Sequence, residues 1–310
     1  MLARSGVGLL EAGMGDQPLD VQLTTNAVAK KATGRRCIAL FVLFLASGLL
    51  VFLPSQFVAY DARRGIQFAV FGGISLFFTG STLFLYRSDR FKPYWQVSFA
   101  YLLAALGLLL GRFFGELPTH WLGLGWNSPK GVALGRLSGA IISAAPVILL
   151  VKLFNGRLGL IYLQRGRLKL GIVIGVTSFI VMAILGLMQV RAEGVGAARL
   201  LQLAPWVLIF IVANGFSEEL FFRGLFLQRY EDFLNRHLSN LVTALVFAIG
   251  HMQVSYTPAV LVLVVAALVF GLASGYIMQK TDSLWASTLF HAGTDTLVVF
   301  AVFRSAGIKM

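Results

Sequence analysis

The sequence is poor in cysteine and in charged residues. Cys37 is the single cysteine among 310 residues, which excludes an internal disulfide and a metal cluster of cysteine thiolates, and argues against a cysteine nucleophile. Charged side chains make up only 13% of the chain, whereas 57% is hydrophobic. A soluble domain does not hide that much apolar surface in one core. The sequence therefore predicts an all-α fold, a polytopic transmembrane helical bundle.

Acidic residues are scarce relative to basic ones. The chain has 13 Asp and Glu against 26 Lys and Arg, for a formal net charge of +13. Such a balance can indicate nucleic-acid binding. Here, however, the Lys and Arg residues gather in short connections between apolar runs, as topology signals and contacts for anionic headgroups do. We expect membrane lipid as a partner and no nucleic acid.

Apolar runs long enough to cross about 30 Å of hydrocarbon recur along the chain, and we count about nine. They cover roughly residues 36–53, 66–86, 94–114, 136–154, 169–190, 204–226, 240–257, 258–279 and 284–303. Basic residues are richer in alternate connections, which predicts a cytoplasmic N-terminus and an external C-terminus. Residues 1–34 hold only a short apolar cluster, too short for a signal peptide, and are expected to form a mobile cytoplasmic tail.

Three charged side chains interrupt the sixth apolar run. Glu219 and Arg223 are four residues apart with the acid first, so they share a helical face and can pair. Glu218 lies about 100° further round the helix and is expected to remain available. Charges at bilayer depth cost several kcal/mol each, so these three residues are functional candidates.

Two later apolar runs each contain a histidine. Phe247 and His251 are four residues apart, as are His291 and Asp295, so each pair lies on one helical face. Counted from the predicted cytoplasmic ends, Glu218, His251 and His291 all lie roughly 14–18 Å deep at 1.5 Å per residue. We therefore expect three helices to bring their ionisable groups to one level near the middle of the bilayer.

The three polar stretches, 218–223, 247–251 and 291–295, follow the patterns Glu-Glu-x-x-x-Arg, Phe-x-x-x-His and His-x-x-x-Asp. Their order resembles the motifs of the CPBP family, also called the ABI family, of CAAX-processing and bacteriocin-processing intramembrane proteases. That family includes the type II CAAX prenyl endopeptidases. The resemblance implies a catalytic transmembrane core at residues 204–305, preceded by transmembrane helices of unassigned role at 35–203. It also implies a bacterial inner-membrane location and a peptide or membrane-anchored protein as substrate.

The same residues suit peptide-bond hydrolysis by water. Glu218 is the candidate general base, with His251 sharing the water. His291 is the candidate donor to the oxyanion of the tetrahedral intermediate.

The remaining polar residues are expected to support this chemistry. Glu219, tied to Arg223, organises the site. Asp295 stands where the family usually has asparagine, and an ionised carboxylate cannot donate a hydrogen bond to an oxyanion. Asp295 must therefore be protonated, orient His291, or bind another group.

Several alternatives stay open. No cofactor is favoured, but Glu218, His251 and His291 could instead hold a zinc ion while Glu219 activates the metal-bound water. Buried acids and histidines also build the proton relays of proton-coupled transporters, although the internal repeats of such transporters are not detected. A noncatalytic scaffold or immunity protein would be expected to have eroded motifs. The intact motifs favour an enzyme.

Overall fold

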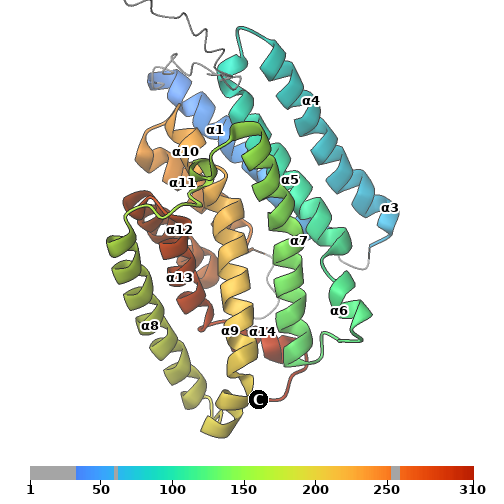
Figure 1. The fold of residues 1–310 in the computed structure, drawn as a ribbon, viewed down its shortest axis with the longest axis vertical. Coiled ribbons are helices and arrows are strands. Elements are labelled where there is room, and N and C mark those ends of the chain that lie inside the picture. Colours follow the sequence, from blue (N-terminus) through green and yellow to red (C-terminus); the bar gives the residue numbers. More distant parts are fainter. Residues whose placement is uncertain (1–32, 59–61, 253–258) are drawn as a thin grey trace, which may run out of the picture.

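The computed structural model describes residues 33–58, 62–252 and 259–310. All regular elements within these ranges are helices, which confirms the predicted all-α bundle (Figure 1). The predicted N-terminal tail lies outside the described residues except for its last two positions, where the first helix begins.

The helices differ widely in length. The long ones are α1 (Gly34–Phe52), α4 (Gly73–Arg87), α5 (Trp95–Phe114), α7 (Pro129–Asn155), α8 (Leu168–Ala192), α9 (Ala197–Glu219) and α12 (Val260–Thr281). The shorter ones are α2 (Pro54–Phe57), α3 (Arg64–Gln67), α6 (Leu117–Trp121), α10 (Leu227–Glu231), α11 (Arg236–Ile249), α13 (Leu284–Asp295) and α14 (Val299–Ser305). The described residues also form two π-helical segments, η1 (Phe68–Gly72) and η4 (Leu220–Gly224), and two 3-10 turns, η2 (Lys92–Tyr94) and η3 (Leu158–Ile161).

Seven stretches of the described chain are long and apolar enough to cross a membrane, and a bent pair, α13 with α14, gives up to eight. The protein is therefore a multi-pass membrane protein, with up to eight candidate spans among the described residues against the nine or so expected. The seventh expected run, 240–257, is wrong as a span because α11 ends at Ile249 and has only 14 residues. Such a helix covers about 21 Å, less than the hydrocarbon thickness. The ninth expected run, 284–303, is divided between α13 and α14, which are bent by 55° relative to each other. The orientation of the termini stays a prediction.

Helix α9 occupies the middle of the bundle (Figure 1). It packs against α7 on one side and α13 on the other, and α8 covers α13. Helix α5 packs between α7 and α4 at the outer edge, while α11 packs between α1 and α12. The three helices α7, α9 and α13 therefore line the centre of the molecule.

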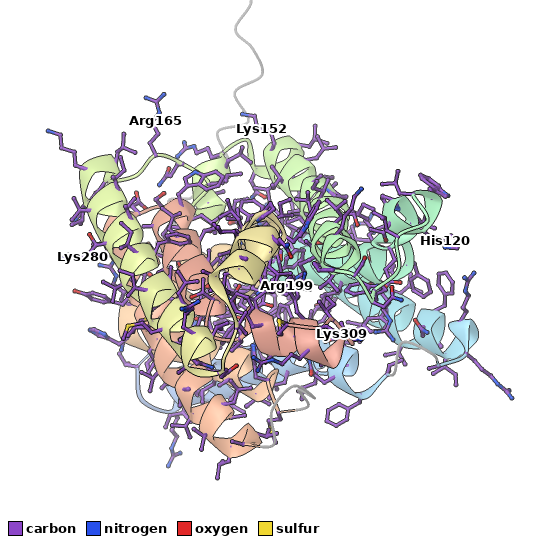
Figure 2. All side chains as sticks on the ribbon, turned by 90° about the horizontal axis from the view of Figure 1, so that it is seen from below. His120, Lys152, Arg165, Arg199, Lys280 and Lys309 are labelled. Atoms are coloured by element: carbon purple, nitrogen blue, oxygen red, sulfur yellow. The ribbon has the colours of Figure 1, made fainter. Side chains whose placement is uncertain are left out.

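The outer faces of the bundle are apolar, as expected for contact with lipid tails. Helix α8 lies at the edge of the view along the bundle axis, while Arg165, in the connection before it, projects outward (Figure 2). Exposed apolar side chains of α8 include Ile172, Val173, Ile180 and Met188. Only the narrow strip of α8 that faces α13 is buried, which suits a helix at the lipid boundary.

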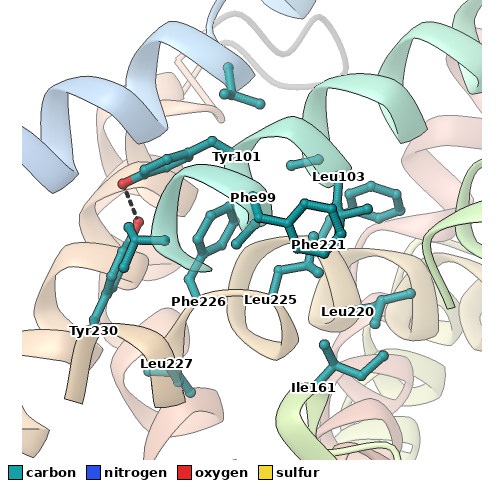
Figure 3. Packing of buried hydrophobic residues seen from close by; sticks show 14 of the residues in the cluster. Phe99, Tyr101, Leu103, Ile161, Leu220, Phe221, Leu225, Phe226, Leu227 and Tyr230 are labelled. Carbon is teal, nitrogen blue, oxygen red and sulfur yellow. Dashed lines mark hydrogen bonds between the residues drawn. The ribbon is translucent and has the colours of Figure 1, made fainter. Parts of the chain in front are cut away.

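A buried aromatic cluster fixes the chain that follows the central helix. The hydroxyl of Tyr101 in α5 donates to the carbonyl oxygen of Phe44 in α1, at 2.8 Å. Its oxygen lies 2.6 Å from the hydroxyl of Tyr230 in α10, which is therefore the donor of that second bond (Figure 3). The rings of Phe44 and Tyr230 also stack, with centroids 4.7 Å apart. These contacts hold α10, and with it the end of the span that begins at α9, against α1 and α5.

Candidate active site

The site forms where the central helix changes its winding. Glu218 and Glu219 are the last two residues of α9, and the π-helical turn η4 follows directly and carries Arg223. Single π-helical turns inside longer helices occur frequently at functional sites. The altered winding leaves the expected pair intact, since Arg223 Nη1 lies 2.6 Å from Glu219 Oε1.

Glu219 is completely enclosed. Its Oε1 accepts from Arg223 and from Nδ1 of His291, the latter at 2.8 Å, and its Oε2 accepts from the hydroxyl of Ser287. Ser287 in turn lies 2.6 Å from the hydroxyl of Ser274. Both Glu219 and Arg223 have 0% exposure. One buried carboxylate thus joins α9, η4, α13 and α12, an arrangement that suits an organising role.

Glu218 is accessible, and it is also paired with a residue that the sequence analysis did not place in the site. Its Oε1 lies 2.7 Å from Nη2 of Arg136, and its side chain is 20% exposed.

The apolar pattern places Arg136 at the start of the fourth apolar run. In the structure α7 begins seven residues earlier, at Pro129, where the Ser128 hydroxyl accepts from the backbone N–H of Gly131 at 3.0 Å. The Ser-Pro helix-start signal could have shown that Arg136 lies inside the helix.

His291 lies between the carboxylates. Its Nε2 is 3.5 Å from Glu218 Oε2 and 3.6 Å from Asp295 Oδ1. Asp295 Oδ2 accepts from Nδ2 of Asn214 at 2.9 Å, and Asn214 Oδ1 accepts from Arg136. A continuous polar chain therefore runs from Glu218 through Arg136 and Asn214 to Asp295.

His251 reaches the site through an aromatic neighbour. The Phe247 ring lies 4.2 Å from Arg223 Cζ, 4.4 Å from the His251 ring and 6.0 Å from the His291 ring. His251 follows the C-cap of α11, Gly250, and its Nδ1–H donates to the Phe247 carbonyl oxygen at 2.8 Å. That bond leaves Nε2 as the acceptor of the neutral ring. Within the described chain, no direct hydrogen bond links His251 to the carboxylates.

The predicted zinc ligands do not form a metal-binding group. Among the described residues, no three His, Cys, Asp or Glu side chains converge as the ligands of a metal ion would. We therefore derive no step through a metal, and metal dependence is a question for experiment.

Close approach of α9 and α13 depends on Gly215. A Cβ there would lie 3.1 Å from the backbone nitrogen of Ala292 and 3.1 Å from the carbonyl oxygen of Thr288. We expect Gly215→Val to lower the free energy of unfolding by about 1–3 kcal/mol, because the two helices must separate. Thermal unfolding in detergent micelles measures this loss. Gly80→Val is the control, since its Cβ would meet nothing within 4 Å, and equal losses in the two variants would contradict the packing argument.

The geometry coincides with a family match. Residues 200–297, from early α9 to just beyond α13, match the family model described as type II CAAX prenyl endopeptidase Rce1-like. This segment is a CAAX protease-like domain. The CAAX protease-like domain contains all six predicted site residues, namely Glu218, Glu219, Arg223, His251, His291 and Asp295. Arg136 lies before it. No curated protein and no solved structure matches the chain significantly.

Proposed function

We propose that this protein is an intramembrane endopeptidase that hydrolyses a peptide bond near the membrane-associated end of a peptide or protein. The observation that carries the proposal is the contrast between the adjacent carboxylates. The side chain of Glu218 is 20% exposed, whereas that of Glu219 has 0% exposure and both of its carboxylate oxygens accept hydrogen bonds. Only Glu218 can meet a water molecule and a substrate, so it is the general base and Glu219 is its support.

In the proposed reaction, Glu218 takes a proton from water while the water oxygen bonds to the scissile carbonyl carbon. The resulting oxyanion accepts a hydrogen bond from Nε2–H of a His291 that carries both protons. Since His291 Nδ1–H donates to Glu219 at 2.8 Å, the ring is already oriented before substrate arrives. The proton on Glu218 then passes to the leaving nitrogen, and the carbon–nitrogen bond breaks.

His251 supplies a second contact for the water in this scheme. Its Nε2 is the acceptor of the neutral ring because Nδ1–H is held by the Phe247 carbonyl oxygen. The half-buried ring stays fixed against Phe247, at 4.4 Å between centroids. A fixed acceptor would orient the attacking water rather than carry its proton.

An apolar groove of about 820 Å³ supports a membrane-associated substrate. It lies between α7, α9 and α13, and Leu137, Ala213 and Ala292 in its lining adjoin Arg136, Asn214 and His291 in the sequence. A hydrophobic substrate segment could therefore lie in the groove while its peptide bond meets the polar site. Prenylated CAAX-type C-termini, double-glycine or bacteriocin-like leaders, and C-terminal sorting signals are the substrate classes that the proposal covers.

Cleavage by the purified full-length protein in lipid vesicles tests this function. The probes are a quenched fluorescent peptide ending in farnesylcysteine and three further residues, the same peptide without the farnesyl group, and a double-glycine leader peptide. We expect one internal bond of at least one probe to be cleaved, as identified by mass spectrometry. If folded protein cleaves none of the three, the proposed function is wrong for these substrate classes.

The same assay with a chelator tests the mechanism. We expect cleavage to persist after incubation with EDTA and 1,10-phenanthroline, because Glu218 and the two histidines suffice in the proposed reaction. Zinc content is measured on the same samples. Loss of cleavage that is restored by added zinc would contradict the metal-free mechanism and leave the peptidase assignment standing.

A further inference from the structure

Carboxylates outnumber guanidinium groups in the candidate site. Three carboxylates, Glu218, Glu219 and Asp295, face two guanidinium groups, those of Arg136 and Arg223. Arg223 is ion-paired with Glu219, and both side chains have 0% exposure. The charges of Glu218 and Asp295 are therefore left to Arg136 and to His291 between them.

Arg136 contacts Glu218 directly and Asp295 through Asn214. Its Nη2 lies 2.7 Å from Glu218 Oε1 and also donates to Oδ1 of Asn214. Asn214 connects Arg136 to the second carboxylate, because its Nδ2 donates to Asp295 Oδ2 at 2.9 Å. The amide can serve only in this orientation, since a flipped amide would set its NH₂ against the guanidinium and its carbonyl oxygen against the carboxylate.

We propose that Arg136 is a positioning residue for the reaction, which holds Glu218 directly and Asp295 through Asn214, and so allows this site to function with aspartate at position 295. The inference rests on the proposed peptidase function. Arg136 belongs to α7, outside the family match at residues 200–297. This chain thus completes its site with a residue from its N-terminal helices, whose role was unassigned.

The surroundings of Arg136 separate it from an ordinary surface ion pair. Exposed pairs contribute little because water solvates both partners. The Arg136 side chain is 37% exposed, but the carboxylates that it holds are more enclosed, at 20% for Glu218 and 8% for Asp295, within a bundle whose outer faces are apolar. Without Arg136, the ion-pair partner left to both carboxylates would be His291, at 3.5 and 3.6 Å, while Asp295 would keep its hydrogen bond from Asn214. The mutual repulsion of the two carboxylates would then turn Glu218 away from the water it must activate.

A double-mutant cycle tests the inference with the farnesylated peptide probe in vesicles. We expect Arg136→Met to lower kcat about 100-fold with KM changed less than about threefold, because the loss lies in positioning rather than binding. Arg136→Lys should recover about tenfold of that loss, since it restores the charge without the fork of the guanidinium. In the Asp295→Asn background, Arg136→Met should cost less than about tenfold, because the second charge is gone.

Two results would overturn the inference. One is an equal loss of kcat on Arg136→Met in the wild-type and Asp295→Asn backgrounds. The other is a lower yield of folded protein whose kcat per folded molecule is unchanged, which would show a merely structural role. The cycle is repeated by thermal unfolding without substrate, where Arg136→Met should lower the unfolding temperature more in the wild-type background than in the Asp295→Asn background. This second readout tests the Arg136–Asp295 coupling even if the peptidase assignment itself fails.

Discussion

Glu218→Gln is expected to lower kcat/KM for the cleaved peptide by about 1000-fold or more while the protein stays folded. The amide oxygen of glutamine can still accept from Arg136 Nη2, which lies 2.7 Å from Glu218 Oε1. The variant therefore keeps the local geometry but cannot take a proton from water. Initial cleavage rates in vesicles measure the loss, and the unfolding temperature shows that the fold survives.

Glu193→Gln is the matched control for this change. Glu193 lies just beyond α8 and pairs with Arg304, whose guanidinium lowers the pKa of that carboxyl. The pair is exposed, at 35% and 41%, so its neutralisation should leave cleavage within about twofold of wild type. Cleavage by Glu218→Gln at the wild-type rate would show that another group activates the water.

Local spacing was sufficient to predict the contacts made within one helix. The interval from Glu219 to Arg223 predicted their ion pair. The ion pair depends on helical geometry over one turn, which can be read from residue spacing alone. The single helical face predicted for Phe247 and His251 is not formed, because α11 ends at Ile249, although the two rings lie 4.4 Å apart. The ordered motifs then indicated that the three segments form one site, as the family match to residues 200–297 supports.

Contacts between helices were harder to predict. Ser287, which donates to Glu219, lies in an apolar run where an isolated serine carries no distinctive signal. Arg136 was hidden for a different reason, because a basic residue beside an apolar run is usually a topology signal. Its role depends on the rotation of α7 against α9, and only the packed structure fixes that rotation. The shortness of α11 was missed because the apolar pattern continues past Gly250, where the helix ends.

Arg223→Met is expected to destabilise the protein more than loss of any exposed ion pair. Removing the guanidinium leaves the buried carboxylate of Glu219 with only its hydrogen bonds from His291 and Ser287. Loss of one partner of a buried ion pair typically costs about 3–5 kcal/mol. The change also removes the stacking of Arg223 Cζ over the Phe247 ring at 4.2 Å. Folded yield from membranes and the thermal unfolding temperature in micelles measure the loss.

Two further variants separate the loss of the ion pair from a loss of packing. Arg304→Met breaks a chemically identical pair whose side chains are 41% and 35% exposed, and it should cost less than about 1 kcal/mol. The double variant Glu219→Gln with Arg223→Met should recover much of the stability lost in Arg223→Met, because no buried charge remains. It should nevertheless lack activity, since a glutamine can turn its NH₂ toward His291 and no longer orients that ring. Equal destabilisation by Arg223→Met and the double variant would contradict this account, because packing alone would then explain the loss.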